Sequence, residues 1–72
     1  MDDSVRAITS ELGGESAVAR ALRIAPSTVG AWNSRDSIPG QWWLAIVRLA
    51  AMSDVPSITY DRLAKLHAKV ET

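Results

Sequence analysis

The sequence predicts an all-α protein, a compact bundle of about five short helices. Apolar residues recur at three- and four-residue intervals along most of the chain, and glycine or proline residues separate these stretches. No stretch alternates apolar and polar residues as a half-buried strand would. Because the chain has 72 residues, we expect a single domain over 1–72 with an economical core.

The first three helices are expected in close succession. Acidic and hydroxyl side chains at 2–4 suit a helix N-terminus, and the apolar repeat behind them ends at Gly13. A short second helix is expected at about 15–22. A third begins at Pro26, whose missing N–H has no cost in the first turn of a helix.

The second and third helices together describe a helix-turn-helix at about 15–34. A turn of three residues joins them, the small residue Ala19 lies where they would cross, and the β-branched Val29 fixes the second helix. The spacing also predicts the core residues around this crossing. They are Val18, Leu22, Ile24, Val29 and Trp32.

A loop is expected over 33–40, followed by the most apolar helix at about 40–52 and a last helix at about 59–70. The 40–52 helix has two adjacent apolar stripes, of which the second consists of Trp43, Val47 and Ala51. We expect this second stripe to meet another copy in a symmetric homodimer, because one small domain has little room to cover both. The alternative is that the last helix covers it within the same chain. The positions left for solvent are Gln41, Leu44, Arg48 and Met52.

Composition excludes several classes of site. Cysteine is absent, which excludes disulfides, thiolate zinc sites and a cysteine nucleophile, and His67 is the only histidine. We expect His67 to be a packing or surface residue. With no acid/base pair, activated nucleophile or phosphate loop in view, we predict no enzyme activity, cofactor, metal or small-molecule ligand. Neither a membrane span nor a signal peptide is visible, so we expect a cytoplasmic protein without a membrane partner.

The charges are balanced in number but not in position. Eight basic and eight acidic residues give a net charge of zero, which argues against nonspecific coating of nucleic acid. The stretch from Arg20 to Arg48 nevertheless holds four arginines and only Asp36 as an acid. The middle of the chain is therefore locally basic.

From Glu15 to Ser34 the chain resembles the helix-turn-helix of the Cro- and cI-type phage repressors, and more closely the short Cro-like regulators of the YdaS kind. The segments "GGESAVARAL", "PSTVGAW" and "SIPGQWWLAI" carry the resemblance. It implies a lambda-repressor-like fold and a sequence-specific regulator of transcription, a repressor or controller of a phage or mobile element. It also implies a bacterial, nucleoid-associated homodimer on a palindromic operator, with half-sites about 34 Å apart.

In such regulators the N-terminal part of the recognition helix reads bases in the major groove. The resemblance places Pro26, Ser27, Thr28 and Ala31 at the bases. Small residues there, together with Gly30, would let the helix approach the bases closely. The expected contacts to the DNA backbone are Arg20, Arg23, Asn33, Ser34 and Arg35.

Three residues depart from that pattern. Arg23 stands where the turn commonly has glycine, so either it takes a left-handed conformation or the turn differs. Ala25 replaces the usual hydroxyl cap, and Glu15 would repel a phosphate unless its carboxylate turns away. A second hypothesis therefore stays open, a helix-turn-helix module that captures another regulator without binding DNA. The zero net charge and a recognition helix without Arg, Lys or Gln over most of its length favour it.

Overall fold

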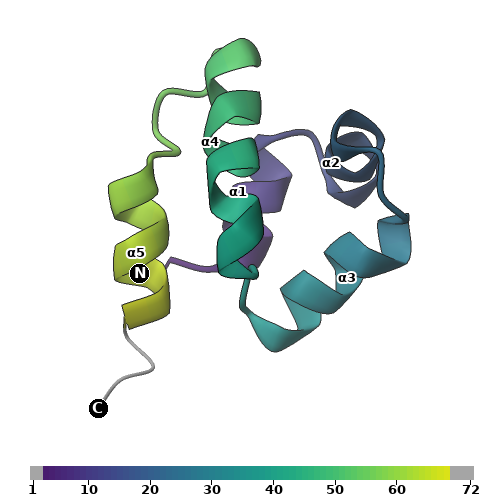
Figure 1. Cartoon of the computed structure of the whole chain (residues 1–72), viewed down its shortest axis with the longest axis horizontal. Helices are drawn as coiled ribbons and strands as arrows, with labels where there is room; N and C mark the ends of the chain where they lie inside the picture. Colours follow the sequence, from purple (N-terminus) through teal and green to yellow (C-terminus); the bar gives the residue numbers. More distant parts are fainter. Residues whose placement is uncertain (1–2, 69–72) are drawn as a thin grey trace.

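The computed structural model describes residues 3–68, which fold into five α-helices and one short 3₁₀ helix (Figure 1). The α-helices are α1 (Val5–Glu11), α2 (Glu15–Leu22), α3 (Pro26–Arg35), α4 (Trp43–Met52) and α5 (Tyr60–Ala68). The 3₁₀ helix Gly40–Trp42 leads directly into α4. The predicted all-α class is confirmed. Over 3–68, no helix is long and apolar enough to cross a lipid bilayer.

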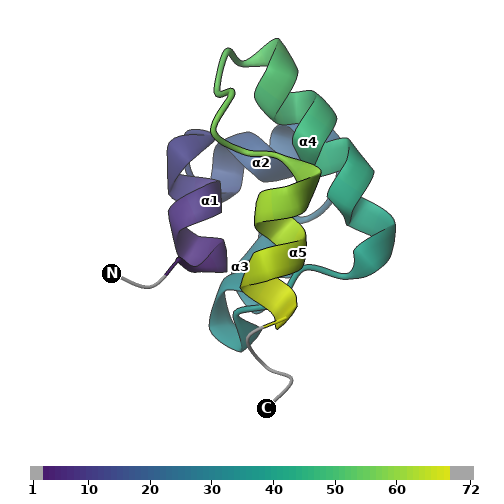
Figure 2. The ribbon, with the colours of Figure 1, turned by 90° about the vertical axis from the view of Figure 1, so that its left-hand side faces the viewer.

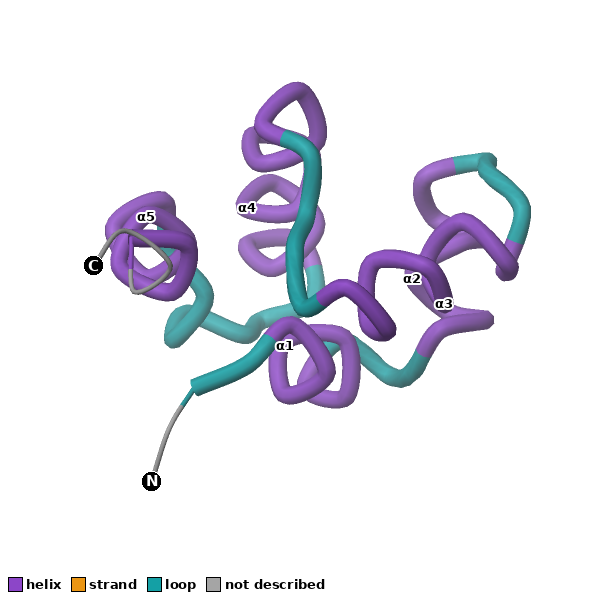
Figure 3. Tube along the Cα trace, turned by 90° about the horizontal axis from the view of Figure 1, so that it is seen from below, coloured by secondary structure: helices purple, strands orange, loops and turns teal. Residues whose placement is uncertain are grey.

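The helices are arranged so that the α2–α3 pair and α5 lie at opposite ends of the molecule. In Figure 1, α4 stands in front of α1, with α5 on one side and α2 and α3 on the other. Figure 2 gives the side view, and Figure 3, seen from below, again separates α5 from α2 and α3 by α1 and α4. The surface of the α2–α3 pair is therefore not covered by the last helix.

Every α-helix contributes to one apolar core. The central residues, each no more than 1% exposed, include Ile8 of α1, Val18 of α2, Trp32 of α3, Ile46 of α4 and Leu63 of α5. The helical spacing predicted Val18 and Trp32 correctly. The other buried apolar residues are Val5, Leu12, Ala19, Val29, Ile38, Ala50, Ile58 and Leu66. Leu22 and Ile24 are half-buried and pack against this core, as predicted.

The helix boundaries differ from the prediction in two places. The loop expected from residue 33 begins later, because α3 continues to Arg35 and ends where Asp36 takes a left-handed conformation (φ 54°). Ser37 N–H then donates to Trp32 O at 3.0 Å and closes the helix end. The last helix starts at Tyr60, and the predicted end at residue 70, with Val70, lies outside the described residues.

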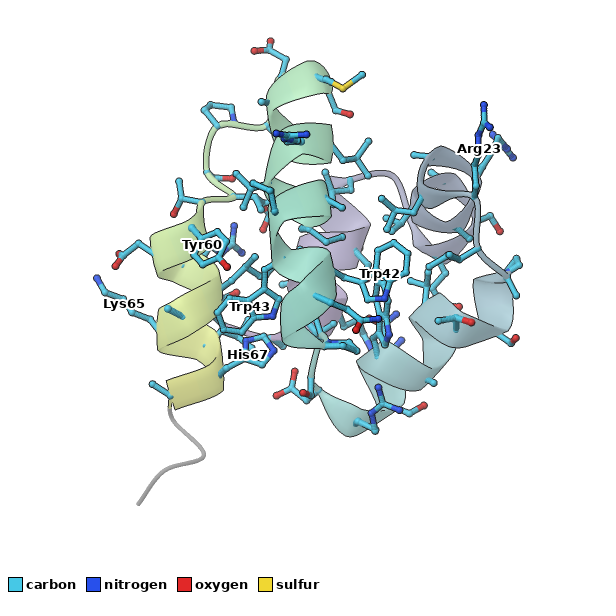
Figure 4. All side chains as sticks on the ribbon, viewed as in Figure 1. Arg23, Trp42, Trp43, Tyr60, Lys65 and His67 are labelled. Carbon is cyan, nitrogen blue, oxygen red and sulfur yellow. The ribbon has the colours of Figure 1, made fainter. Side chains whose placement is uncertain are left out.

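Two neighbouring tryptophans, Trp42 at the end of the 3₁₀ helix and Trp43 at the start of α4, lie on opposite sides of the helix (Figure 4). The Trp42 ring packs 5.8 Å from the Trp32 ring of α3. The Trp43 ring packs 5.5 Å from Tyr60 and 4.7 Å from His67, both on α5. Its Nε1 also donates to Ile38 O at 2.7 Å. Trp42 and Trp43 therefore each pack against another helix of the same chain.

The homodimer interface predicted at Trp43, Val47 and Ala51 stays a prediction, but the structure packs Trp43 against α5 of its own chain. Trp43 and Val47 are half-buried and pack against the core of their own chain; Val47 and Ala51 also line a hollow with residues of the loop before α5. The alternative stated from the sequence, in which the last helix covers the second stripe, is confirmed at Trp43. Ala51, the third predicted interface residue, is exposed at the end of that stripe. The homodimer itself stays a prediction, without the anchor assigned to it.

Polar contacts fix α5 against the rest of the chain. His67 Nε2 accepts a hydrogen bond from Ile38 N–H at 2.8 Å, while Nδ1 lies 2.7 Å from Leu63 O, to which it donates. His67 is therefore a packing residue, as expected. Arg62 forms ion pairs with Asp3 and Glu11, each at 2.8 Å, and joins α5 to both ends of α1.

The Arg62 contact predicts a loss of stability in acid. Hydrogen bonding to the Arg62 guanidinium holds the pKa of Glu11 below its usual value of 4.5. The ionised form is therefore favoured by folding, and its contribution is present above that usual value and lost as the pH falls through the lower folded value. We expect the unfolding free energy of Glu11→Gln to fall less over this range than that of the wild type. Denaturant unfolding at a series of pH values measures both, and equal slopes would contradict the role of this pair.

Candidate nucleic-acid interface

The α2–α3 pair forms a helix-turn-helix. Ala19 of α2 and Val29 of α3, 1% and 0% exposed, lie in the contact between the helices, and residues 23–25 form the turn. Arg23 takes a left-handed conformation with φ 60° and ψ 45°. Ile24 N–H donates to Ala19 O at 3.0 Å, so α2 ends in the manner usual for a glycine at this position. The first of the two conformations considered for Arg23 is thus correct.

The outward side of α3 carries the four predicted base-reading residues. Pro26 and Ser27 are exposed, and Thr28 and Ala31 are half-buried at the edge of the helix. Ala25, in the extended conformation of an N-cap residue (φ −68°, ψ 140°), supplies no side-chain hydrogen bond to α3. The first turn of α3 is therefore uncapped by any side chain and lined by small residues.

The Glu15 carboxylate turns toward α3. Its Oε2 accepts from Asn33 Nδ2 at 2.7 Å, and Asn33 Oδ1 lies 3.1 Å from Thr9 Oγ1. These three side chains connect α1, α2 and α3 beneath the outward face of α3. Glu15 would repel a nearby phosphate unless its carboxylate turned away from it. This condition is met in part, because Glu15 is half-buried and its carboxylate accepts a hydrogen bond from the Asn33 amide.

The prediction that Asn33 contacts the DNA backbone is wrong. Asn33 is only 9% exposed, and both ends of its amide have partners inside the protein. It follows Val29 by four residues, so the two lie on the same inward side of α3. The sequence analysis expects a loop from residue 33. With the third helix extended past Trp32, the same spacing identifies Asn33 as an inward residue.

The arginines around α2 and α3 are uncompensated. Within residues 3–68, none of five arginines forms an ion pair. They are Arg6, Arg20, Arg23, Arg35 and Arg48, and all are exposed. Figure 4 shows Arg23 pointing away from the body of the molecule. Ser34, beside Arg35 in the last turn of α3, is exposed as well.

Three acidic residues outside α2 and α3 form ion pairs with cations of α5. Asp3 and Glu11 pair with Arg62, and Asp61 pairs with Lys65 on α5, at the end of the molecule opposite α2 and α3. Within the described part of the chain, the arginines at α2 and α3 form no ion pairs, and the acidic residues nearest to them along the chain are Glu15 and Asp36.

A polar hollow of about 470 Å³ lies where α2 begins, lined among others by Arg6, Ser10, Gly14 and Ser16. Gly14, the residue before α2, provides no side-chain hydrogen bond to the first turn of α2. The Glu15 carboxylate lines the same hollow and opposes the binding of an anion beside Arg6. Sequence reasoning missed Arg6, because only the packing of α1 against α2 brings it there.

Two residues of this surface lower the stability of the fold. A left-handed conformation costs arginine about 1 kcal/mol, and glycine at position 23 would avoid it. Gly30 lies inside α3, where alanine is favoured by about 1 kcal/mol. A Cβ there would meet Glu15 Oε1 at 3.5 Å, an ordinary contact. The fold alone therefore favours glycine at 23, where the chain has the larger and charged arginine. It favours alanine at 30, where the chain has the smaller glycine.

In comparisons with known proteins, no family model, curated protein or solved structure matched this chain. Functional inference therefore depends on the chain's own surface. Among residues 3–68, no group of three or more His, Asp or Glu side chains gathers as a metal ion would need.

Proposed function

We propose that this protein is a sequence-specific DNA-binding regulator of transcription whose helix α3 enters the major groove. The observation that carries the proposal is Arg23, an exposed cation at the turn between α2 and α3 that keeps a left-handed conformation unfavourable for arginine. A cation at 23 is useful beside a phosphate. Such departures from local preference are expected at functional sites.

The roles of individual residues follow from their positions. Pro26, Ser27, Thr28 and Ala31 meet base edges, through hydroxyl groups and methyl contacts. Arg20, Arg23, Ser34 and Arg35 hold the DNA backbone on either side of α3. Because α3 offers no bidentate donor to a base, sequence-dependent DNA shape contributes to specificity.

The biological setting is part of the same proposal. Two copies bind the halves of a palindromic operator, in the cytoplasm where bacterial DNA lies, and control transcription of a phage or mobile element. The rival hypothesis is a module that captures another regulator without DNA. The half-exposed carboxylate of Glu15 near α3 favours it.

Salt dependence separates the two hypotheses. The affinity for DNA should fall with a log–log slope of about −0.9 for each phosphate neutralised. Arg23→Gly should reduce the slope by about 1 and weaken binding to all sequences, while raising the unfolding free energy by up to about 1 kcal/mol. Lys65→Ala, which removes a cation of α5 at the opposite end, is the matched control and should leave the slope unchanged.

Selection from a random DNA pool identifies the DNA sequence that the protein binds. Titration of that DNA at several salt concentrations then gives the slope. Thr28→Val should change the bases selected, because the hydroxyl is lost and the shape is kept. Absence of any enriched DNA, or a slope equal in Arg23→Gly and wild type, would favour the capture module instead.

A further inference from the structure

A second surface, distinct from the outward face of α3, is an apolar groove between α2 and α4. The hollow has a volume of about 580 Å³. Ala21 and Leu22 of α2 form one wall, and α4 lines the other along its exposed face. On that face Leu44 is 52% exposed and Met52 is 85% exposed. Large apolar side chains left in water at a hollow are typical of a binding site.

The charge of the groove is one-sided. Among its lining residues only Gln41 and Arg48 are polar, and none is acidic. Arg48 is exposed and has no ion pair within the described part of the chain. The complementary ligand is therefore apolar with a carboxylate placed to reach Arg48.

The shape of the groove favours a helix. Its α4 wall runs from Gln41 to Met52, about three turns or about 16 Å of helix. The small residues Ala21 and Ala45 line the groove and permit a helix backbone to come close. A second copy of this chain is a poor occupant, because packing this face on itself would bring Arg48 toward Arg48 with no acidic residue of the groove between them.

We propose that the α2–α4 groove binds an amphipathic helix of a partner protein, about three turns long, with an apolar face and an acidic residue that pairs with Arg48. Apolar residues of the partner at i, i+3, i+4 and i+7 lie between Leu22 and Leu44, the usual arrangement of a helix in a groove. This function goes beyond DNA binding and does not depend on it.

The probe is a set of helical peptides of about 14 residues with leucines at i, i+3, i+4 and i+7. Each carries Glu, or in its counterpart Lys, at one flanking position in turn. Titration into the full chain, followed by fluorescence anisotropy and by NMR shifts of Leu44 and Met52, measures affinity and location. The best Glu peptide should bind about tenfold more tightly than its Lys counterpart.

Two exposed positions supply the variants. Arg48→Glu should reverse the preference in favour of the Lys peptide, and Leu44→Asp should remove binding of both, while circular dichroism stays unchanged. No peptide binding, equal affinities for Glu and Lys peptides, or no reversal in Arg48→Glu would overturn the proposal. Self-association of the wild type that Leu44→Asp abolishes would also overturn it, because a second copy would then occupy the groove. No DNA is present, so this result is independent of the proposed function.

Discussion

Trp43→Ala is expected to lower the unfolding free energy by about 3 kcal/mol and to leave the number of copies in solution unchanged. The Trp43 ring fills the space between α4 and α5 against Tyr60 and His67, and its Nε1 satisfies Ile38 O. Truncation removes these contacts and leaves a cavity between the two helices. Because the ring is half-buried, the loss lies at the low end of the range for a large aromatic residue.

The neighbouring residue offers a matched control. Leu44 is 52% exposed, so Leu44→Ala should change the unfolding free energy by less than about 1 kcal/mol. Denaturant unfolding and sedimentation of wild type and both variants give stability and mass together. A Trp43→Ala protein with wild-type stability but a smaller mass than wild type would restore this residue to a subunit interface.

Sequence periodicity predicted most of the fold because the inward positions of a helix are set locally. Ile8, Val29 and Leu63 repeat at helical spacing and are buried. Periodicity does not identify which neighbour covers a stripe, and for that reason Trp43 was assigned to a partner chain. Ile38, 1% exposed in the loop before α4, has no repeat to reveal it.

The candidate site was predictable in part for the same reason. The outward residues of α3, Ser27 among them, follow from helical geometry once the helix is placed. Arg6 and Asn33 depend on how α1 packs beside α2 and α3, which local spacing cannot give. From the sequence, a left-handed Arg23 is one of two possible conformations of the turn. That a Cβ at Gly30 would find space beside Glu15 is visible only in the structure.

The largest effect on DNA binding is expected at Ala25, where two caps of equal strength differ in charge. Ala25 has the backbone of an N-cap residue but no side chain to cap α3. Ala25→Ser and Ala25→Asp should each raise the unfolding free energy by about 1 kcal/mol, because either side chain accepts a hydrogen bond from the first turn. The serine variant should bind DNA nearly as the wild type does.

The aspartate variant should bind DNA more weakly by on the order of a hundredfold, because its carboxylate would stand among phosphates beside Arg23. Thermal unfolding and DNA titration at one fixed salt concentration measure both quantities on the same three proteins. Equal DNA affinities for the serine and aspartate variants would place the start of α3 away from the DNA, and with it the groove assignment would fail. Since both variants are expected to be more stable than wild type, a loss confined to Ala25→Asp has no explanation in unfolding and reports the charge of the surface that meets DNA.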